Sequence, residues 1–366
     1  MSYQKILWVV PDLPSANEIL PFLETIDNNR WYSNFGPLEK QFREELAQTF
    51  FPDLPPDNLT TASSGALAIE IALIAHGFPP GARILIPSYT FVATAAAVIR
   101  AGYVPIFADV EVESLQMPPE SAARLARSHG CAAVVPVGPA GMEIPTAPWD
   151  AFVEDSGIPV ILDAAASLGN QPVGNHLTVA FSLHATKPLG IGEGGLVVSR
   201  NTNLISRART TANFGLEGGR GVLSGTNAKL SEYHAAVGLA QIQRRQSILH
   251  RRMDVLRLFE SQAASFQDEF RLLTPSRKSP ANLLVLFKEN RAKATRERLA
   301  AAGFESRRLY IPPVHRHPAY LGFPCAEPLH QCEVLASRSL SLPCHFLMTP
   351  DDVQRMMQAL VKSPLS

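Results

Sequence analysis

The sequence predicts an α/β fold in which a mostly parallel sheet is covered by helices on both faces and a smaller α/β domain follows. Short apolar runs alternate with helical segments up to about residue 212, which is typical of a parallel sheet between two layers of helices. The chain has 366 residues, 46% of them hydrophobic, which is enough for one large domain and a smaller one. We therefore expect two domains.

The large domain is predicted from one periodic segment after another. Helical periodicity occurs at Pro37–Phe50, Ala66–His76, Ala93–Arg100, Pro118–Ser128 and Leu204–Ala212. Apolar, strand-like runs occur at Ala82–Ser88, Tyr103–Val110, Cys131–Val137, Ile158–Asp163 and Gly194–Ser199. Because helices separate most of these runs, we expect mainly parallel strands.

A long helical segment from Leu230 to about Arg257 is expected to link the two domains. The smaller domain is predicted to contain a strand at Ala281–Lys288, a helix at Lys293–Gly303 and a capped terminal helix at Thr349–Leu360. These segments give a large domain at 1–245, whose N-terminal part could also pack on the small domain, and a small domain at 246–366.

The composition argues against several classes of protein. Lys and Arg total 33 and Asp and Glu total 33, so bulk charge would hold neither nucleic acid nor an anionic membrane. The four cysteines have no spacing typical of a metal site or a redox pair, and we expect free thiols: Cys131, Cys325, Cys332 and Cys344. Pro11 and Asp12 interrupt the N-terminal apolar run, so we expect neither a secretory signal nor a membrane span, and a cytoplasmic location.

The stretch Ser182–Gly195 places Lys187 in a polar loop between two strand-like runs. The loop continues with Gly190, Gly192, Gly194 and Gly195, which would let backbone approach a ligand or another subunit closely. A lysine amine that is partly desolvated, or close to other positive charge, has a lowered pKa and can bond covalently to a cofactor carbonyl. An ordinary solvated loop lysine is the alternative.

Asp163 ends the apolar run VILD and is followed by small residues. Ligands of open parallel sheets bind beyond the carboxyl ends of the strands, where Asp163 is expected to lie. A carboxylate there can pair with a protonated pyridine nitrogen and keep the ring an electron sink. A helix cap is the alternative.

Ser63, Ser64 and Gly65 lead directly into the apolar helix that is predicted from Ala66. The free N–H groups of a helix start, with nearby hydroxyls, form a natural phosphate site. The alternative is again an ordinary helix cap.

Over nearly its whole length the chain resembles the DegT/DnrJ/StrS aminotransferases, which are fold-type-I pyridoxal 5'-phosphate (PLP) enzymes that mostly make amino sugars on nucleotide carriers. The segments that carry the resemblance are Asn29–Ala47, Ser63–Leu73, Ile86–Val110, Asp163–Gly169, Ser182–Gly195, Gly225–Ile242 and Ser341–Val353. The resemblance implies PLP as cofactor and a transaminase as activity.

Carried over by position, the resemblance makes Lys187 the lysine that holds PLP covalently, Asp163 the partner of its ring nitrogen and Phe91 the side chain that stacks on the ring. The cofactor phosphate would be contacted by Ser64, Gly65, Ala66 and Ser182. Asn227 would reach the phosphate in the neighbouring subunit, which implies a homodimer with shared active sites.

The chain also departs from the family pattern. Ala166 stands where Gln is frequent, Ala66 stands where Thr is usual, and Val137–Gly141 replaces a Val-His-x-Tyr-Gly segment. Residues that could face the substrate, with ordinary packing or surface roles as the alternative, are His184, Tyr310, His315 and His317. Arg307, Arg308 and Arg316 could contact a diphosphate or be plain surface charges.

The resemblance implies transfer of an amino group from glutamate to a nucleotide-linked keto sugar. Asn29–Pro37 and Ser182–Pro188 are closest to the branch that acts on the fourth carbon, and so favour a dTDP-4-keto-6-deoxy sugar. A sugar dehydratase of the same fold is the first alternative, but that branch has histidine in place of Lys187. The second is a non-catalytic or regulatory relative, supported only by the departures at Ala166 and at 138–141.

Overall fold

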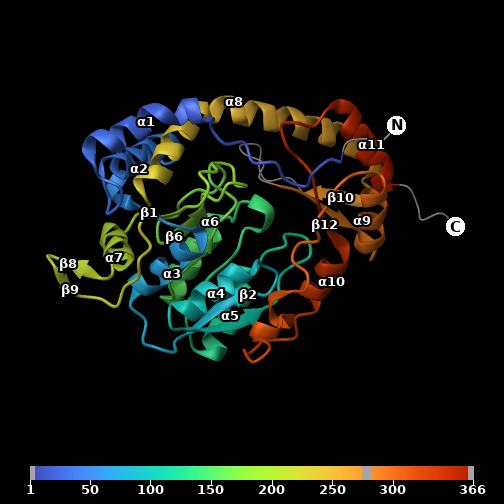
Figure 1. Ribbon diagram of the computed structural model, residues 1–366. Helices are drawn as coiled ribbons and strands as arrows, with labels where there is room; N and C mark the ends of the chain where they lie inside the picture. Colours follow the sequence, from blue (N-terminus) through green and yellow to red (C-terminus); the bar gives the residue numbers. More distant parts are fainter. Residues whose placement is uncertain (1–4, 274–281, 362–366) are drawn as a thin grey trace.

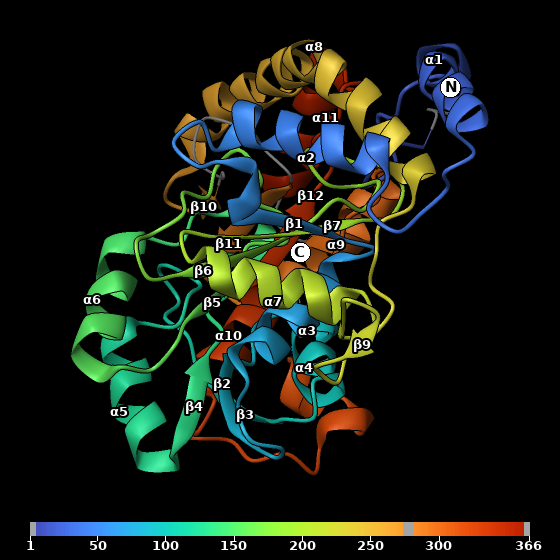
Figure 2. The same ribbon diagram turned by 90° about the vertical axis from the view of Figure 1, so that its left-hand side faces the viewer.

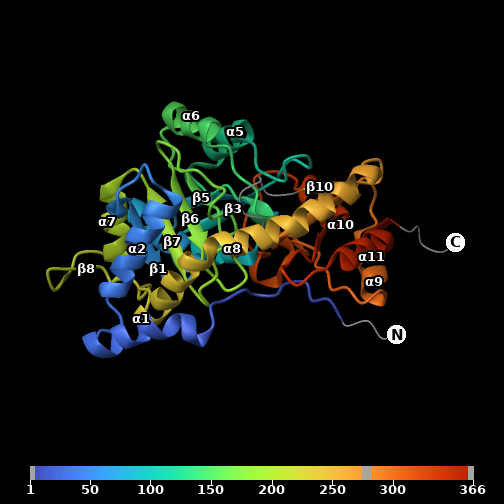
Figure 3. The ribbon, with the colours of Figure 1, turned by 90° about the horizontal axis from the view of Figure 1, so that it is seen from above.

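The computed structural model describes residues 5–273 and 282–361 and contains a large and a small domain joined by one long helix (Figure 1). This helix, α8 (Glu232–Ala263), begins beside α2 (Pro37–Phe50) and ends beside α11 (Pro350–Val361) (Figure 3). The predicted α/β fold is confirmed. Within the described residues, no helix is both long enough and apolar enough to cross a membrane.

Seven strands of the described chain form the central sheet of the large domain. They are β1 (Leu59–Ala62), β2 (Arg83–Pro87), β3 (Val104–Ala108), β4 (Cys131–Val134), β5 (Ile161–Asp163), β6 (Thr178–Ser182) and β7 (Gly195–Ser199). One part has the order β3-β2-β4 and the other has the order β5-β6-β7-β1. Parallel bridges from Val134 to Val160 and from Val137 to Asp163 join the two parts. Only β7 runs antiparallel to its neighbours in this sheet.

Helices cover both faces of this sheet. They are α2, α3 (Gly65–His76), α4 (Val92–Arg100), α5 (Pro119–His129), α6 (Thr146–Ser156) and α7 (Thr202–Ala212), whereas α1 (Ala16–Asn29) packs on α8. Figure 2 shows α2 and α8 on one side of β1 and β7, and α3 and α7 on the other. α3 is apolar on nearly all sides because it packs against the sheet, α4 and α7, and it ends where Gly77 takes a left-handed conformation.

The small domain contains a three-stranded antiparallel sheet and three helices. Its strands are β10 (Phe270–Leu273), β11 (Leu283–Phe287) and β12 (Ser339–Leu342), in the order β10-β11-β12. Its helices are α9 (Ala292–Ala301), α10 (His330–Arg338) and α11. α8 contributes to two apolar cores: Ala235, Ala236 and Leu239 belong to the core of the large domain, and Val255, Leu256 and Phe259 to that of the small domain.

The N-terminal segment lies along α8 and the small domain. Its Asp12 carboxylate pairs with Arg244 at 2.9 Å and Arg251 at 2.6 Å, both on α8. The carbonyl of Leu7 and the indole of Trp8 bond to His345 and Ser341 of the small domain. The segment therefore connects the interdomain helix with the small domain.

Several elements were not predicted from the sequence, namely α1, β1, α6, β6, β10, α10 and β12. Predicted strands were also too long: β4 ends at Val134 and β5 begins at Ile161. Pro136 and Pro159 flank these ends and lack the N–H that a ladder needs. Residue 245 lies inside α8, and Ala281, the predicted start of β11, lies outside the described residues.

Candidate active site

Asp163 lies at the carboxyl end of β5, as predicted, with only 5% of its surface exposed. Its Oδ2 accepts a hydrogen bond of 2.7 Å from Thr94 on α4, and its Oδ1 accepts one of 3.2 Å from the N–H of Ala165. Burial raises the pKa of this carboxyl, while both hydrogen bonds and the charge of Lys187 act to lower it. The described residues place no cation within ion-pair distance of Asp163, so it can accept a cationic partner.

Lys187 lies in the loop between β6 and β7 and is half-buried. The backbone N–H of Lys187 donates a hydrogen bond of 2.8 Å to the backbone carbonyl of His184, which fixes a tight turn. Burial lowers the pKa of the Lys187 amine, and the charge of Asp163 partly opposes this shift. A lowered pKa makes the amine more available as a nucleophile or base.

The glycines of this loop make close contacts within the chain. A Cβ on Gly190 would lie 2.4 Å from the carbonyl oxygen of Ala185, and one on Gly195 would lie 2.2 Å from that of Ser64. These positions need glycine because the loop folds against itself and against the start of α3. The described chain therefore explains both glycines without a ligand or a second subunit.

The start of α3 lies against the end of β6. Ser64 caps the helix by accepting a hydrogen bond of 3.2 Å from the N–H of Leu67. A Cβ on Gly65 would lie 2.5 Å from the Cβ of Ser182, so this glycine lets the two segments meet. Ser64, Gly65, Ala66 and Ser182 thus form one cradle of hydroxyls and helix N–H groups.

Two aromatic residues lie close to this edge of the sheet. Phe91 directly precedes α4, the helix that carries Thr94, and 63% of its surface is exposed. Tyr310 packs edge-on against Tyr89, with ring centres 5.2 Å apart. Burial raises the pKa of Tyr310 to about 12, and the charge of Asp163 adds to the increase. Tyr310, from the small domain, therefore lies near the Asp163 carboxylate.

Other predicted residues are held by different partners. His315 Nδ1 lies 2.7 Å from Ser88 Oγ, and its Nε2 lies 3.2 Å from Glu333. His184 Nδ1 lies 2.9 Å from Thr186 Oγ1, and His317 Nε2 donates to the Pro312 carbonyl at 3.0 Å. These contacts favour local packing roles.

The three arginines considered for a diphosphate each have another partner. Arg316 pairs with Glu333 at 2.7 Å, and Arg308 donates to the carbonyl of Ala336 at 2.8 Å. The guanidinium of Arg307 lies over the ring of Trp8. These contacts favour structural roles for the three arginines.

Asn227 is exposed in the loop before α8. The carbonyl of the next residue, Ala228, accepts a hydrogen bond of 2.7 Å from the N–H of Ser63. The loop that carries Asn227 therefore lies beside the α3 start of its own chain, and its reach toward a second subunit stays a prediction.

The positions that depart from the family pattern are tightly packed. Ala166 is buried, and a Cβ on Gly138 would lie 2.4 Å from the carbonyl oxygen of Met142. The N–H of Ala140 lies beside the phenol oxygen of Tyr310 and lowers its pKa against the effect of burial. A larger side chain at Gly138 would therefore require the loop to move.

The family model of the DegT/DnrJ/EryC1/StrS aminotransferases matches residues 15–361. The chain belongs to this family. It is similar to Protein Rv3402c from Mycobacterium tuberculosis, with 32% identity over 97% of this chain and 89% of the relative. This aminotransferase is therefore a PLP-dependent transaminase with the fold-type-I architecture that the sequence predicts.

Solved structures of similar proteins match this aminotransferase over almost its whole length. A structure from Bacillus cereus ATCC 10987, named as a PLP-dependent aminotransferase, has a TM-score of 0.90 and 27% identity, and the match covers 98% of this chain and 100% of that one. The structure of DesI in the presence of its TDP-sugar product has a TM-score of 0.87 and 26% identity, and covers 98% and 93%.

The residues of this aminotransferase fit PLP. The α3 start offers N–H groups and hydroxyls for a phosphate, and the exposed ring of Phe91 offers a stacking face. Among the described residues, buried Asp163 forms no ion pair with a cation, and the half-buried amine of Lys187 could bond to the cofactor. By contrast, the described residues contain no group of three or more His, Cys, Asp or Glu side chains placed to hold a metal ion.

Sequence reasoning missed Thr90 and Thr94. Thr90 Oγ1 lies 2.8 Å from Thr94 Oγ1, which in turn donates to Asp163, and all three side chains are buried. The segment YTFVAT was matched to the family, but only Phe91 was singled out from it. Two threonines four residues apart, one just before α4 and one in its first turn, were the available signal.

Proposed function

We propose that this aminotransferase moves an amino group from glutamate to a nucleotide-linked keto sugar, with PLP bound covalently at Lys187. The observation that carries the proposal is the placement of Lys187 and buried Asp163 at one edge of the sheet, close enough for each charge to change the pKa of the other. Bound PLP supplies an electron sink that stabilises negative charge at the substrate carbon.

The roles of the protein groups follow from their positions. The Lys187 Nζ takes the proton from the α-carbon of the amino donor, a step that its lowered pKa assists. The Asp163 carboxylate holds a proton on the ring nitrogen, and Thr94 keeps that carboxylate in place. Ser64, Gly65, Ala66 and Ser182 bind the phosphate, and Phe91 covers one face of the ring.

We propose a dTDP-4-keto-6-deoxy sugar as the acceptor and the 4-amino sugar as the product. The likeness to DesI, whose structure was determined with its TDP-sugar product, supports this choice. The segments Asn29–Pro37 and Ser182–Pro188, which resemble the branch that acts on the fourth carbon, support it as well. Tyr310 is our candidate for a substrate contact, because it lies near Asp163.

Borohydride reduction of the purified, yellow protein tests the cofactor assignment. We expect the reduced cofactor on a peptide that contains Lys187, and we expect Lys187→Ala to hold cofactor weakly and to lose transamination. Lys293→Ala, at an exposed position of α9, is the matched control and should keep both properties. Labelling of another lysine, or turnover of Lys187→Ala at the wild-type rate, contradicts the assignment.

A comparison of acceptors tests the substrate. With glutamate as donor, we expect turnover of a dTDP-4-keto-6-deoxy sugar to exceed that of its 3-keto isomer, of a GDP-linked 4-keto sugar and of a free keto-cyclitol. Preference for the 3-keto sugar or the cyclitol would overturn the assignment of the fourth carbon. It would not affect the assignment of transaminase activity. Preference for the GDP-linked sugar would overturn only the choice of nucleotide.

A further inference from the structure

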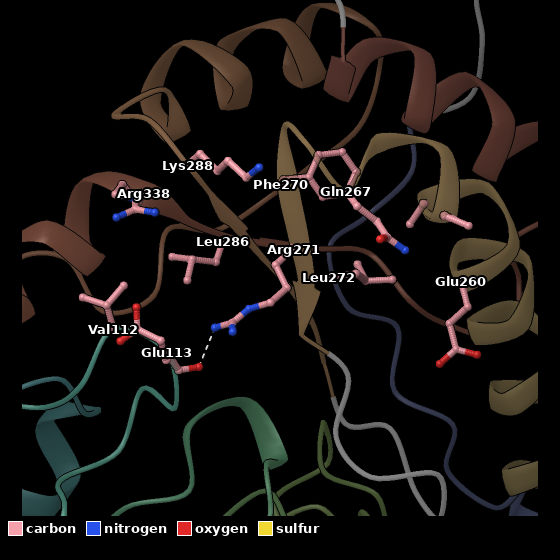
Figure 4. A pocket seen from close by; sticks show the side chains of 12 residues that line it. Val112, Glu113, Glu260, Gln267, Phe270, Arg271, Leu272, Leu286, Lys288 and Arg338 are labelled. Atoms are coloured by element: carbon pink, nitrogen blue, oxygen red, sulfur yellow. Dashed lines mark hydrogen bonds between the residues drawn. The ribbon is translucent and has the colours of Figure 1, made fainter.

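A cavity of about 560 Å³ lies between the two domains (Figure 4), and neither Lys187 nor Asp163 is among the residues that line it. We call it the edge-strand cleft. Its lining residues are Val112, Glu113, Glu260, Ala263, Ala264, Gln267, Phe270, Arg271, Leu272, Leu286, Lys288 and Arg338. They come from the loop after β3, the end of α8, strands β10 and β11, and the end of α10. Its volume is within the range usual for small-molecule sites.

One wall of the cleft is the free edge of β10. Among the described strands, β10 pairs only with β11. The N–H of Lys288 donates a hydrogen bond of 3.2 Å to the carbonyl of Glu269. Because every second residue of an antiparallel strand bonds to its partner, Glu269, Arg271 and Leu273 face β11. The N–H groups of Phe270 and Leu272 therefore point away from β11 and toward the cleft, where a ligand can accept their hydrogen bonds.

Three cations gather on one side of β10. Figure 4 shows Arg271, Lys288 and Arg338 on the same side as Val112 and Glu113, whereas Glu260 and Gln267 lie on the other. In the described chain, none of the three cations forms an ion pair with Glu113 or Glu260. Lys288 pairs with Asp268 at 3.6 Å, but both of these side chains are exposed. The cationic side of the cleft thus keeps an excess of positive charge.

The two arginines are held in place without being neutralised. Arg338 Nε donates to the carbonyl of Phe287 at 2.6 Å, which orients the guanidinium and leaves its two terminal NH2 groups for another acceptor. Arg271 Nη2 donates to the carbonyl of Glu113 across the domain boundary. A guanidinium whose orientation is already fixed is well suited to a bidentate contact with an anion.

We propose that the edge-strand cleft binds a small organic phosphate. The three cations outnumber the two nearby carboxylates, those of Glu113 and Asp268, and two guanidinium groups suit the oxygens of a phosphate better than those of a single carboxylate. The apolar side chains of Val112 and Leu286, on the same side as Arg271, would contact the organic part. Because the lining comes from both domains, a bound ligand would act on the reaction only through the relative position of the domains.

Titration calorimetry on the PLP-loaded enzyme, with phenyl phosphate as probe, tests this proposal. We expect phenyl phosphate to bind and inorganic phosphate to bind more weakly, because it cannot use the apolar wall. Arg271→Gln/Arg338→Gln should weaken phenyl phosphate binding about tenfold or more. Arg127→Gln, which removes a cation from an exposed position of α5, is the matched control and should not change it. The visible absorbance of the cofactor should stay constant, which separates the cleft from the active site.

Two further variants keep the test decisive. Arg338→Lys retains the positive charge but loses the paired N–H donors of the guanidinium. The affinity of this variant for phenyl phosphate should therefore lie between those of the wild type and the double variant. If thermal unfolding shows that the double variant is destabilised, Lys288→Gln replaces it, since Lys288 is exposed. Equal affinity for phenyl phosphate in the wild type and the cleft variants, or an absence of binding to the wild type at millimolar concentration, would overturn the proposal.

Discussion

The hydroxyl of Thr94 donates a hydrogen bond of 2.7 Å to Asp163 Oδ2. Because its hydrogen is used in this way, the contact of 2.8 Å between Thr94 and Thr90 requires Thr90 to be the donor. Thr90 therefore donates to Thr94, and Thr94 donates to Asp163. In the proposed mechanism Thr94 would act through Asp163, as a positioning residue.

Loss of the Thr94 hydroxyl should change the pH profile. The hydrogen bond lowers the pKa of Asp163 against the effect of burial, so Thr94→Val should raise that pKa. In the proposed mechanism this carboxylate is ionised, and the acidic limb of kcat/KM should therefore move to higher pH. Thr94→Ser, which keeps the donor, should restore the wild-type limb. If the acidic limb of kcat/KM lies at the same pH in Thr94→Val as in the wild type, Thr94 has only a packing role.

Asp163→Asn should keep the fold and slow proton transfer by at least about a hundredfold. The amide oxygen can still accept the hydrogen bond from Thr94, but a neutral amide cannot hold a proton on the ring nitrogen as a carboxylate does. Single-turnover conversion with glutamate, followed by cofactor absorbance, measures this step. An unchanged rate would leave Asp163 with only a structural role.

Gly65→Ala should weaken both the fold and the phosphate site. The added Cβ would lie 2.5 Å from the Cβ of Ser182, and overpacking of this kind costs about 1–3 kcal/mol. Unfolding of the cofactor-free protein measures the first effect, and the Kd for PLP measures the second. Gly322→Ala, where a Cβ meets nothing within 4 Å, is the control. The added substitution Ser182→Gly should restore part of the stability, since the Cα of residue 182 would still lie 3.0 Å away, and no gain at all would contradict the steric explanation.

We expect a homodimer in which Asn227 completes the site of the partner, and subunit mixing tests this. Lys187→Ala and Asn227→Asp should each be inactive alone. If Asn227 acts in trans, mixed dimers hold one intact site, and complete exchange should restore roughly a quarter of the wild-type activity. If Asn227 serves the α3 start of its own chain, beside which its loop lies, verified exchange will restore nothing.

Local sequence patterns were sufficient for much of the fold. The apolar runs that became β2 and β3 lie between helices with clear periodicity, and Asp163 ends β5 where the pattern placed it. The terminal helix was predicted from its cap, and Thr349 and Asp352 do bond to each other at that end. In each case residues close in sequence carried the signal.

The elements that were missed lack such signals. α10 ends at Arg338 and β12 begins at Ser339, so no turn residue separates the helix from the strand. α1 contains Pro21, which weakens a helical pattern. Thr94 and Asp163 are 69 residues apart, and their contact depends on the packing of α4 beside β5. A single sequence gives no local sign of such a pair.

The 32 residues of α8 give a rod about 48 Å long, and apolar residues near its two ends belong to different cores. If either core unfolds, the apolar residues that α8 contributes to it become exposed. The helix is then less stable, and so is its packing in the other core. Heating should therefore give a single cooperative transition, and a chain cut at residue 245 would break the rod within its length. The same rod limits how the domains can approach each other, because a continuous helix without proline rarely bends sharply.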